Sequence, residues 1–84
     1  MVYVYILQSS NDKGFYIGIT KNFVSRLSKH NKGQVESTRK RKPFVLIYNE
    51  ELKDYKSARL REIEIKSFKG GIKFKELIKH CRVV

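Results

Sequence analysis

The sequence has little of what secreted and membrane proteins depend on. It has one cysteine, Cys81, which cannot form a disulfide within the chain, and no histidine and cysteine cluster spaced for structural zinc. The apolar run from Met1 to Leu7 is too short to cross a membrane and lacks the charged start and cleavage site of a signal peptide. We therefore expect a reducing, cytoplasmic location and no association with membranes.

Acidic residues are also scarce, since 8 Asp and Glu stand against 19 Lys and Arg and leave a net charge of +11. This excess must face water, where it attracts a polyanion, and nucleic acid is the first candidate. An anionic membrane would require a basic amphipathic helix or a lipidation signal, and the N-terminus shows neither. With 84 residues, 40% of them hydrophobic, the chain is expected to form one domain over residues 1–84.

The beginning of the chain predicts a β-hairpin. Residues 2–8 alternate between two faces that are both apolar, which is typical of a central strand. Residues 9–14 have the composition of a turn, and a second strand follows over residues 15–19. If Gln8 pairs with Lys13, Tyr5 lies directly opposite Tyr16, although the length of the turn can shift this register by one or two residues.

A helix is predicted next, with Asn22 as its N-cap and Gly33 as its stop. Arg26 and His30 are four residues apart on this helix and therefore lie on one stripe, from which both can reach one ligand. The rest of the chain is predicted to hold a basic loop over residues 33–43, a strand over 44–48, a helix from Asp54 or Ser57 to about Lys69, and a last helix over 73–79.

The second long helix has an acidic residue where an apolar one is expected. Ala58, Glu62 and Ile65 fall on one stripe, so Glu62 interrupts a surface that is otherwise suited to packing. Leu60 and Ile63 lie on another side of the helix, which indicates that it packs on more than one side. Five polar positions (Tyr5, Tyr16, Arg26, His30 and Glu62) thus stand out as candidates for acid, base, phosphate or metal chemistry.

These positions and their spacing resemble the GIY-YIG nuclease superfamily, especially its small single-domain bacterial members. The first motif is Tyr3-Val4-Tyr5, which lacks the usual glycine, and the second is Tyr16-Ile17-Gly18. Arg26, His30 and Glu62 follow in the family's order, and no asparagine occurs after Asn49. The resemblance implies a mixed α/β (α+β) fold in which helices flank a small three-stranded antiparallel sheet, in the order β-β-α-β-α-α.

The resemblance also implies a metal-dependent endonuclease, with Glu62 binding Mg2+ or Mn2+. A single carboxylate suits Mg2+, because this ion keeps several waters and takes other oxygens from phosphate. Tyr5 or Tyr16 would orient the attacking water, with Tyr5 as the general base if nearby cations favour its phenolate. Arg26 would bind the scissile phosphate, and His30 would bind phosphate or carry a proton. Gly18, without a side chain, would let phosphate approach the second strand.

Nucleic acid is the expected partner, with DNA preferred over RNA, and a protein partner or a homodimer is left open. Because no base-reading device is visible, we expect recognition of nucleic-acid structure, such as branches, flaps or ends, rather than of sequence. Contacts to the sugar-phosphate backbone are assigned to Thr38, Arg39, Lys40, Arg41 and Lys66.

Each candidate also has a simpler interpretation. The two tyrosines can be packing residues of the strands, and Arg26 and His30 can be a solvated helix edge. Glu62 can pair with Arg59 or Lys66 at helical spacing, in which case no metal is implied. The corresponding alternative function is a non-catalytic nucleic-acid-binding module or a subunit of a larger nuclease complex.

Overall fold

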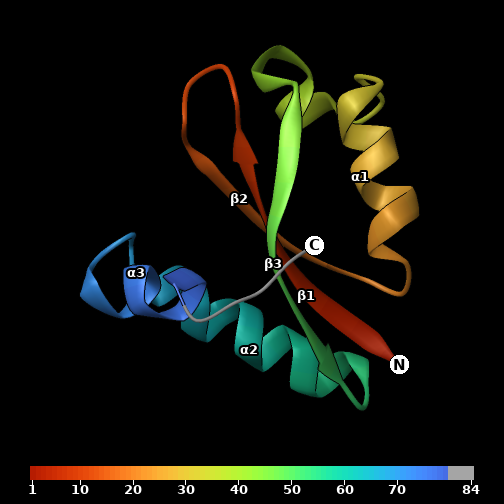
Figure 1. Ribbon diagram of the computed structural model, residues 1–84. Helices are drawn as coiled ribbons and strands as arrows, with labels where there is room; N and C mark the ends of the chain where they lie inside the picture. Colours follow the sequence, from red (N-terminus) through yellow and green to blue (C-terminus); the bar gives the residue numbers. More distant parts are fainter. Residues whose placement is uncertain (80–84) are drawn as a thin grey trace.

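Three antiparallel strands form one sheet in the order β2-β1-β3. The computed structural model describes residues 1–79, apart from the side chain of Ser37, so Cys81 lies outside the described residues. The apolar β1 takes the central place that its sequence predicts (Figure 1). The strands are β1 (Val2–Ser9), β2 (Phe15–Thr20) and β3 (Phe44–Leu52).

The helices follow the predicted order β-β-α-β-α-α, which confirms the predicted mixed fold. Asn22 and Asp54 cap the two longer helices, each accepting a hydrogen bond from a backbone N–H three residues further on. No helix described in residues 1–79 is long and apolar enough to cross a membrane. The helical segments are α1 (Phe23–Asn31), the 3-10 helix η1 (Glu36–Arg41), α2 (Tyr55–Ser67) and α3 (Ile72–Lys79).

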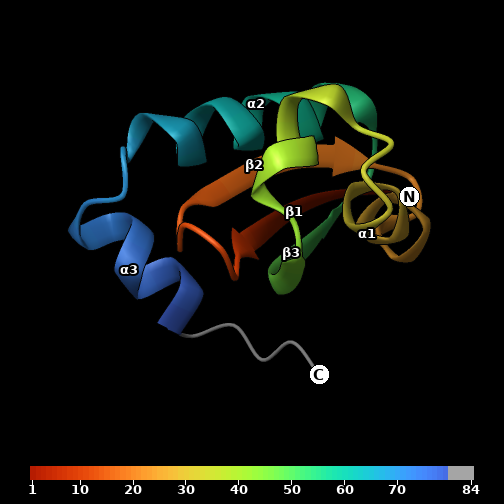
Figure 2. The same ribbon diagram turned by 90° about the horizontal axis from the view of Figure 1, so that it is seen from above.

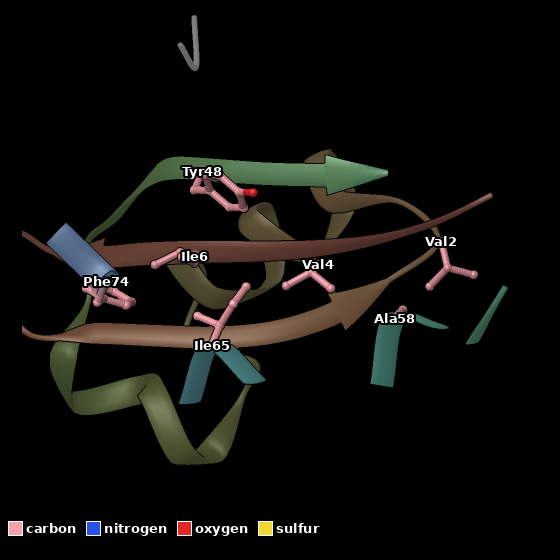
Figure 3. Close-up of a cluster of buried hydrophobic side chains, with 7 residues drawn as sticks. All are labelled: Val2, Val4, Ile6, Tyr48, Ala58, Ile65 and Phe74. Carbon is pink, nitrogen blue, oxygen red and sulfur yellow. The ribbon is translucent and has the colours of Figure 1, made fainter. Parts of the chain in front are cut away.

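Each face of the sheet buries its own hydrophobic core, because alternate side chains of β1 point to opposite faces. In both overall views α1 and α3 lie on opposite sides of the sheet (Figure 2). The core on the side of α2 and α3 contains Val2, Val4, Ile6, Tyr48, Ala58, Ile65 and Phe74 (Figure 3). The core on the side of α1 contains Tyr5, Leu7 and Phe44, with Phe23 and Leu27 of the helix packed against them.

The predicted hairpin register is wrong by two residues. Tyr5 lies opposite Gly18, and Tyr16 lies opposite Leu7. The reason is a longer turn, in which the hydroxyl of Ser9 accepts hydrogen bonds from two backbone N–H groups, at 3.0 and 3.1 Å. A shift of two residues keeps every side chain on its face, so Tyr5 and Tyr16 remain diagonal neighbours, with ring centroids 6.3 Å apart.

The strand β3 is longer than the predicted range of residues 44–48. It continues to Leu52, with a shift of register where Tyr48 pairs with Ile6 and Leu46 pairs with Leu7. Glu50 accepts hydrogen bonds from the Tyr48 hydroxyl at 2.5 Å and from the Arg61 guanidinium at 3.0 Å. The charge of Glu50 is therefore balanced within the fold.

The helix α2 uses only one stripe for the core. Ala58, Glu62 and Ile65 are its buried residues, as the spacing predicts. Leu60 and Ile63, in contrast, are 61% and 52% exposed, so the prediction that these two pack on another side is wrong.

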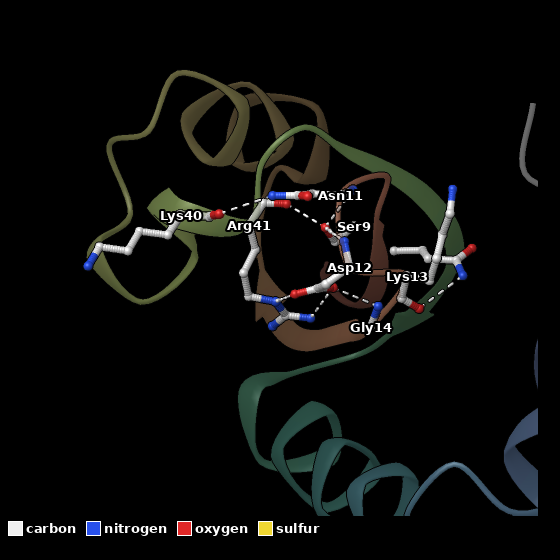
Figure 4. A network of polar contacts seen from close by, with 8 residues as sticks. Ser9, Asn11, Asp12, Lys13, Gly14, Lys40 and Arg41 are labelled. Atoms are coloured by element: carbon white, nitrogen blue, oxygen red, sulfur yellow. Dashed lines mark hydrogen bonds and ion pairs between the residues drawn. The ribbon is translucent and has the colours of Figure 1, made fainter.

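Polar contacts fix η1, which takes the place of the predicted loop, to the turn of the hairpin (Figure 4). The Ser9 hydroxyl donates to the backbone carbonyl of Arg41 at 2.5 Å, and the Arg41 guanidinium pairs with the Asp12 carboxylate at 2.7 Å. Asp12 also accepts a hydrogen bond from the N–H of Gly14 at 2.7 Å. The basic segment thus folds back onto the hairpin instead of extending into solvent.

Gly18 is required by the ring of Tyr5. A Cβ atom added at Gly18 would lie 2.6 Å from the Tyr5 hydroxyl oxygen and 2.7 Å from Cζ, and Tyr5 is only 1% exposed, so its ring has little freedom to move. We predict that Gly18→Ala lowers the free energy of unfolding by about 1–3 kcal/mol, as overpacking does. Urea denaturation measures this, and the double variant Tyr5→Leu/Gly18→Ala should show less than additive loss. Additive losses would contradict the proposed clash.

Candidate active site

The phenol of Tyr5 lies in the middle of a chain of hydrogen bonds that is buried at His30 and partly buried at Arg26. The guanidinium Nε of Arg26 donates to its oxygen at 3.4 Å, and the phenol lies 3.3 Å from Nε2 of His30. Tyr5 is 1% exposed and His30 is fully buried. Arg26 and His30, predicted to share a helix stripe, thus converge on one hydroxyl group.

The far side of the imidazole determines its tautomer. Nδ1 of His30 lies 2.7 Å from the hydroxyl of Thr38, which in turn donates to the carbonyl of Val35 at 3.3 Å. With the one proton of this hydroxyl donated to the carbonyl, the proton between His30 and Thr38 is assigned to Nδ1. Nε2 is then left as an acceptor, and the Tyr5 hydroxyl donates to it.

Burial keeps both groups neutral. Burial, together with the smaller effect of the positive charge of Arg26, lowers the pKa of His30 from 6.5 to about 4. Burial also raises the pKa of Tyr5 above 10.0, and the hydrogen bond from Arg26 opposes this only in part. The expectation that nearby cations favour a Tyr5 phenolate is therefore not met in this state of the protein, since desolvation outweighs them.

Tyr16 and Gly18 complete this part of the site. The Tyr16 ring is half-buried, and its centroid lies 4.8 Å from that of His30 in an edge-on arrangement. The space over Gly18, which the sequence assigns to an approaching phosphate, is filled by the ring of Tyr5. The glycine therefore serves the placement of the tyrosine.

Glu62 lies on α2, the helix that packs on β1 and β2. Its carboxylate is near enough to Tyr5 for its charge to raise the pKa of the phenol. Although Glu62 is only 6% exposed, both of its oxygens are paired, one with Arg59 and one with Lys66, each at 3.0 Å. Within residues 1–79 no group of three or more His, Cys, Asp or Glu side chains comes together. A cation here would therefore have one carboxylate ligand and would displace a basic side chain.

Several residues assigned to nucleic-acid contacts have other partners. Thr38 is fully buried against His30 and cannot contact nucleic acid, which corrects its assignment. Arg39 donates to the carbonyl of Gly33 at 3.1 Å, and Arg41 pairs with Asp12. Lys66 pairs with Glu62, and Lys40 is exposed. His30 is also buried too deeply to bind phosphate directly.

Sequence reasoning missed two features of the site. Nothing in the sequence marks Thr38 as the partner of His30, because the contact depends on the way η1 folds back. A basic pocket beside Arg26, lined also by Lys21, Lys29 and Tyr55, was missed as well. Arg26 and Lys29 are three residues apart on α1, and this spacing was the available signal for the pocket, whereas Lys21 precedes α1 and Tyr55 comes from α2.

A three-stranded sheet that holds tyrosine, histidine and arginine side chains in one network defines a small mixed α/β protein with a candidate site for acid-base chemistry. The family model described as the GIY-YIG catalytic domain matches residues 1–73. The chain therefore belongs to the GIY-YIG family, a family of nucleases that act on nucleic acid.

Individual relatives agree with this assignment. The chain is 39% identical over 74 residues to a UPF0213 protein of Staphylococcus haemolyticus, covering 87% of this chain and 89% of the relative. It is 38% identical over 74 residues to a UPF0213 protein of Staphylococcus saprophyticus, with the same coverage of 87% and 89%. The solution NMR structure of a UPF0213 protein from Bacillus halodurans is 32% identical and superposes with a TM-score of 0.59, covering 94% of this chain and 84% of the other.

The neutral, buried His30 should make stability depend on pH. Between about pH 6.5 and pH 4 the unfolded chain binds a proton on His30 that the folded protein does not take up. We therefore predict that stability falls as pH decreases through this window, by up to about 1.4 kcal/mol per pH unit. Thermal melting of wild type and His30→Gln measures this, since the variant should lose this part of the dependence. Parallel profiles for the two proteins would contradict the buried neutral imidazole.

Proposed function

We propose that this protein is a metal-dependent endonuclease that hydrolyses phosphodiester bonds in DNA and recognises nucleic-acid structure rather than sequence. The observation that carries this proposal is the hydrogen bond between Tyr5 and Nε2 of His30, whose other ring nitrogen, Nδ1, bonds to Thr38. It gives the phenol an acceptor for its own proton, which a tyrosine that acts as a general base requires.

Arg26 controls access to the phenol. It bonds to the Tyr5 hydroxyl in the free protein and also lines an open pocket, so it can turn toward a phosphate. This movement uncovers the Tyr5 oxygen for the attacking water. It also removes a positive charge that lowers the pKa of His30, so the imidazole becomes a better acceptor at the moment when substrate binds.

Hydrolysis then needs two linked proton movements. The water oxygen bonds to phosphorus as its proton passes to the Tyr5 oxygen, and the phenol proton passes to Nε2 of His30. The bond from phosphorus to the leaving oxygen breaks with its electron pair, while Arg26 opposes the charge that develops on the phosphate. Tyr16, beside His30, is the other phenol that can hold the water.

Glu62 is the residue that would hold Mg2+ or Mn2+. A single largely buried carboxylate fits an ion that keeps most of its waters and takes oxygens from phosphate. When bound, such an ion supplies positive charge at the phosphate and a more acidic water. Lys66 and Arg59 are exposed enough to move off the carboxylate, with side-chain exposures of 53% and 65%.

The paired state of Glu62 also favours a second candidate function. If Arg59 and Lys66 keep both carboxylate oxygens, the protein binds nucleic acid through its +11 charge without turnover. The same would hold if the chain serves as a subunit of a larger nuclease complex. The test of cleavage below separates these cases.

The first test is cleavage of labelled single-stranded, duplex, flap and branched DNA, and of RNA, with Mg2+, with Mn2+ and with EDTA. We predict cleavage of DNA only with metal. Glu62→Ala should lose it, and Tyr5→Phe should be roughly 100- to 10,000-fold slower, the usual contribution of a general base. Both variants should still bind the substrate.

Tyr16→Phe serves as the matched control for Tyr5→Phe, because it removes the other phenol of the site. A larger loss in Tyr16→Phe would move the role of base to Tyr16. Binding without cleavage of any substrate, or full activity in Glu62→Ala, would reject the endonuclease and support the binding module.

Thr38 is predicted to be a positioning residue for His30. Thr38→Val removes the hydroxyl but keeps the shape, leaving the buried Nδ1–H without a partner, which costs about 1–3 kcal/mol of stability. We expect a lower kcat with little change in KM, because Thr38 does not reach substrate, and a shifted pH profile of kcat. Thr38→Ser, which keeps a hydroxyl, should recover most of the lost kcat and most of the wild-type pH profile. An unchanged pH profile in the valine variant would show that Thr38 only packs.

A further inference from the structure

A polar pocket of about 240 Å³ lies where the end of β2 meets the beginnings of α1 and α2. Among the described residues that line it, three are cationic (Lys21, Arg26 and Lys29) and none is acidic. Asn22 and Ser25 of the first turn of α1 also line it. Three positive charges around one small pocket favour an anion.

One wall of this pocket is aromatic. Tyr55, the first residue of α2, is 51% exposed, so its ring is open to a ligand in the pocket. The ammonium group of Lys21 lies 5.7 Å from the centroid of this ring. An aromatic ring beside several cations can stack a base while the cations bind the adjoining phosphates.

The larger pocket on the other side of the sheet has no such charge. It measures about 450 Å³ and is lined by residues of β3, α2 and α3. Its arginine, Arg61, pairs with Glu50 at 3.0 Å and with Glu64 at 2.8 Å, and Glu76 offsets Lys73 in its lining. Charge therefore points to the smaller pocket as the place for a polyanion.

The small pocket is continuous with the candidate active site through Arg26. The same guanidinium that lines the pocket donates to the Tyr5 hydroxyl at 3.4 Å. A strand whose scissile phosphate lies on Arg26 therefore places a neighbouring nucleotide in the pocket. At about 240 Å³ the pocket is smaller than the roughly 300–1,000 Å³ of sites for drug-sized ligands, which suits one base or one sugar-phosphate unit.

We propose that this pocket is a subsite for one unpaired nucleotide next to the scissile phosphate, with its base stacked on Tyr55 and its phosphates bound by Lys21 and Lys29. This inference rests on the proposed nuclease function and specifies its substrate class. In a duplex both faces of a base are covered by its neighbours, so a stacking ring selects single strands, flap bases and frayed ends.

The test measures binding without divalent metal, so that it does not depend on turnover. The probes are a fluorescein-labelled single-stranded DNA of mixed sequence, an abasic strand of the same length, and a blunt-ended duplex with G·C pairs at both ends. Tyr55→Leu should weaken binding of the base-bearing strand about 5- to 150-fold, the range for the loss of one base-aromatic stack. It should leave the abasic strand and the duplex unchanged, and Tyr55→Phe should bind like wild type.

Matched controls separate stacking from charge. Leu60→Ala, at another exposed apolar position of α2, should have no effect. Lys21→Ala and Lys29→Ala should weaken binding of the base-bearing and abasic strands alike and reduce the salt slope by about 0.7 each. Lys75→Ala, at an exposed position of α3, should change neither the binding nor its salt slope.

Equal losses for Tyr55→Leu on base-bearing and abasic strands, or no loss on either, would overturn the subsite. The outcomes also separate this inference from the proposed function. A protein that shows the Tyr55 effect but cuts no substrate keeps the subsite and loses the nuclease proposal. A protein that cuts with metal but binds strands independently of Tyr55 keeps the nuclease proposal and loses the subsite.

Discussion

The close approach of the Tyr5 ring to the backbone of Gly18 is the contact on which the rest of the site depends. Without a side chain at Gly18, the ring can lie across β2 and bring its hydroxyl to α1. There it meets Arg26 and His30, the two polar residues that α1 aligns on one stripe. One missing Cβ atom thus determines whether sheet and helix share a hydrogen-bonded network.

That network extends to the surface through η1. Thr38 fixes the tautomer of His30, and η1 is itself tied to the hairpin turn by Asp12 and Ser9 through Arg41 (Figure 4). Basic residues that look like a solvated loop are therefore partly structural. The positive charge that remains beside the site comes from Lys21, just before α1, and from Arg26 and Lys29 on α1. Arg26 thus belongs both to the basic pocket and to the hydrogen-bonded network of Tyr5.

Local sequence determined much of this fold. The order of the three strands, the cap at Asn22 and the central place of β1 were predicted correctly, because they depend on alternation and on side chains that bond to nearby backbone. Of the two caps left open for α2, Asp54 is the one that the structure has, and β3 continues beyond its predicted end. The register of the hairpin was not predicted correctly, because it depends on hydrogen bonds inside the turn around Ser9. The buried stripe with Glu62 was recognised, but the exposure of Leu60 was not.

The sequence by itself identified the candidate residues of the site: two tyrosines, an arginine and a histidine on one hairpin and helix, and a glutamate on a later helix. Only the tertiary structure decided what each one contacts. Thr38 became the partner of His30 because η1 folds back over α1, and Tyr55 joined the pocket of Arg26 because α2 begins beside β2. Both contacts join segments far apart in the chain, and long-range packing, unlike caps and periodicity, leaves no local pattern to read.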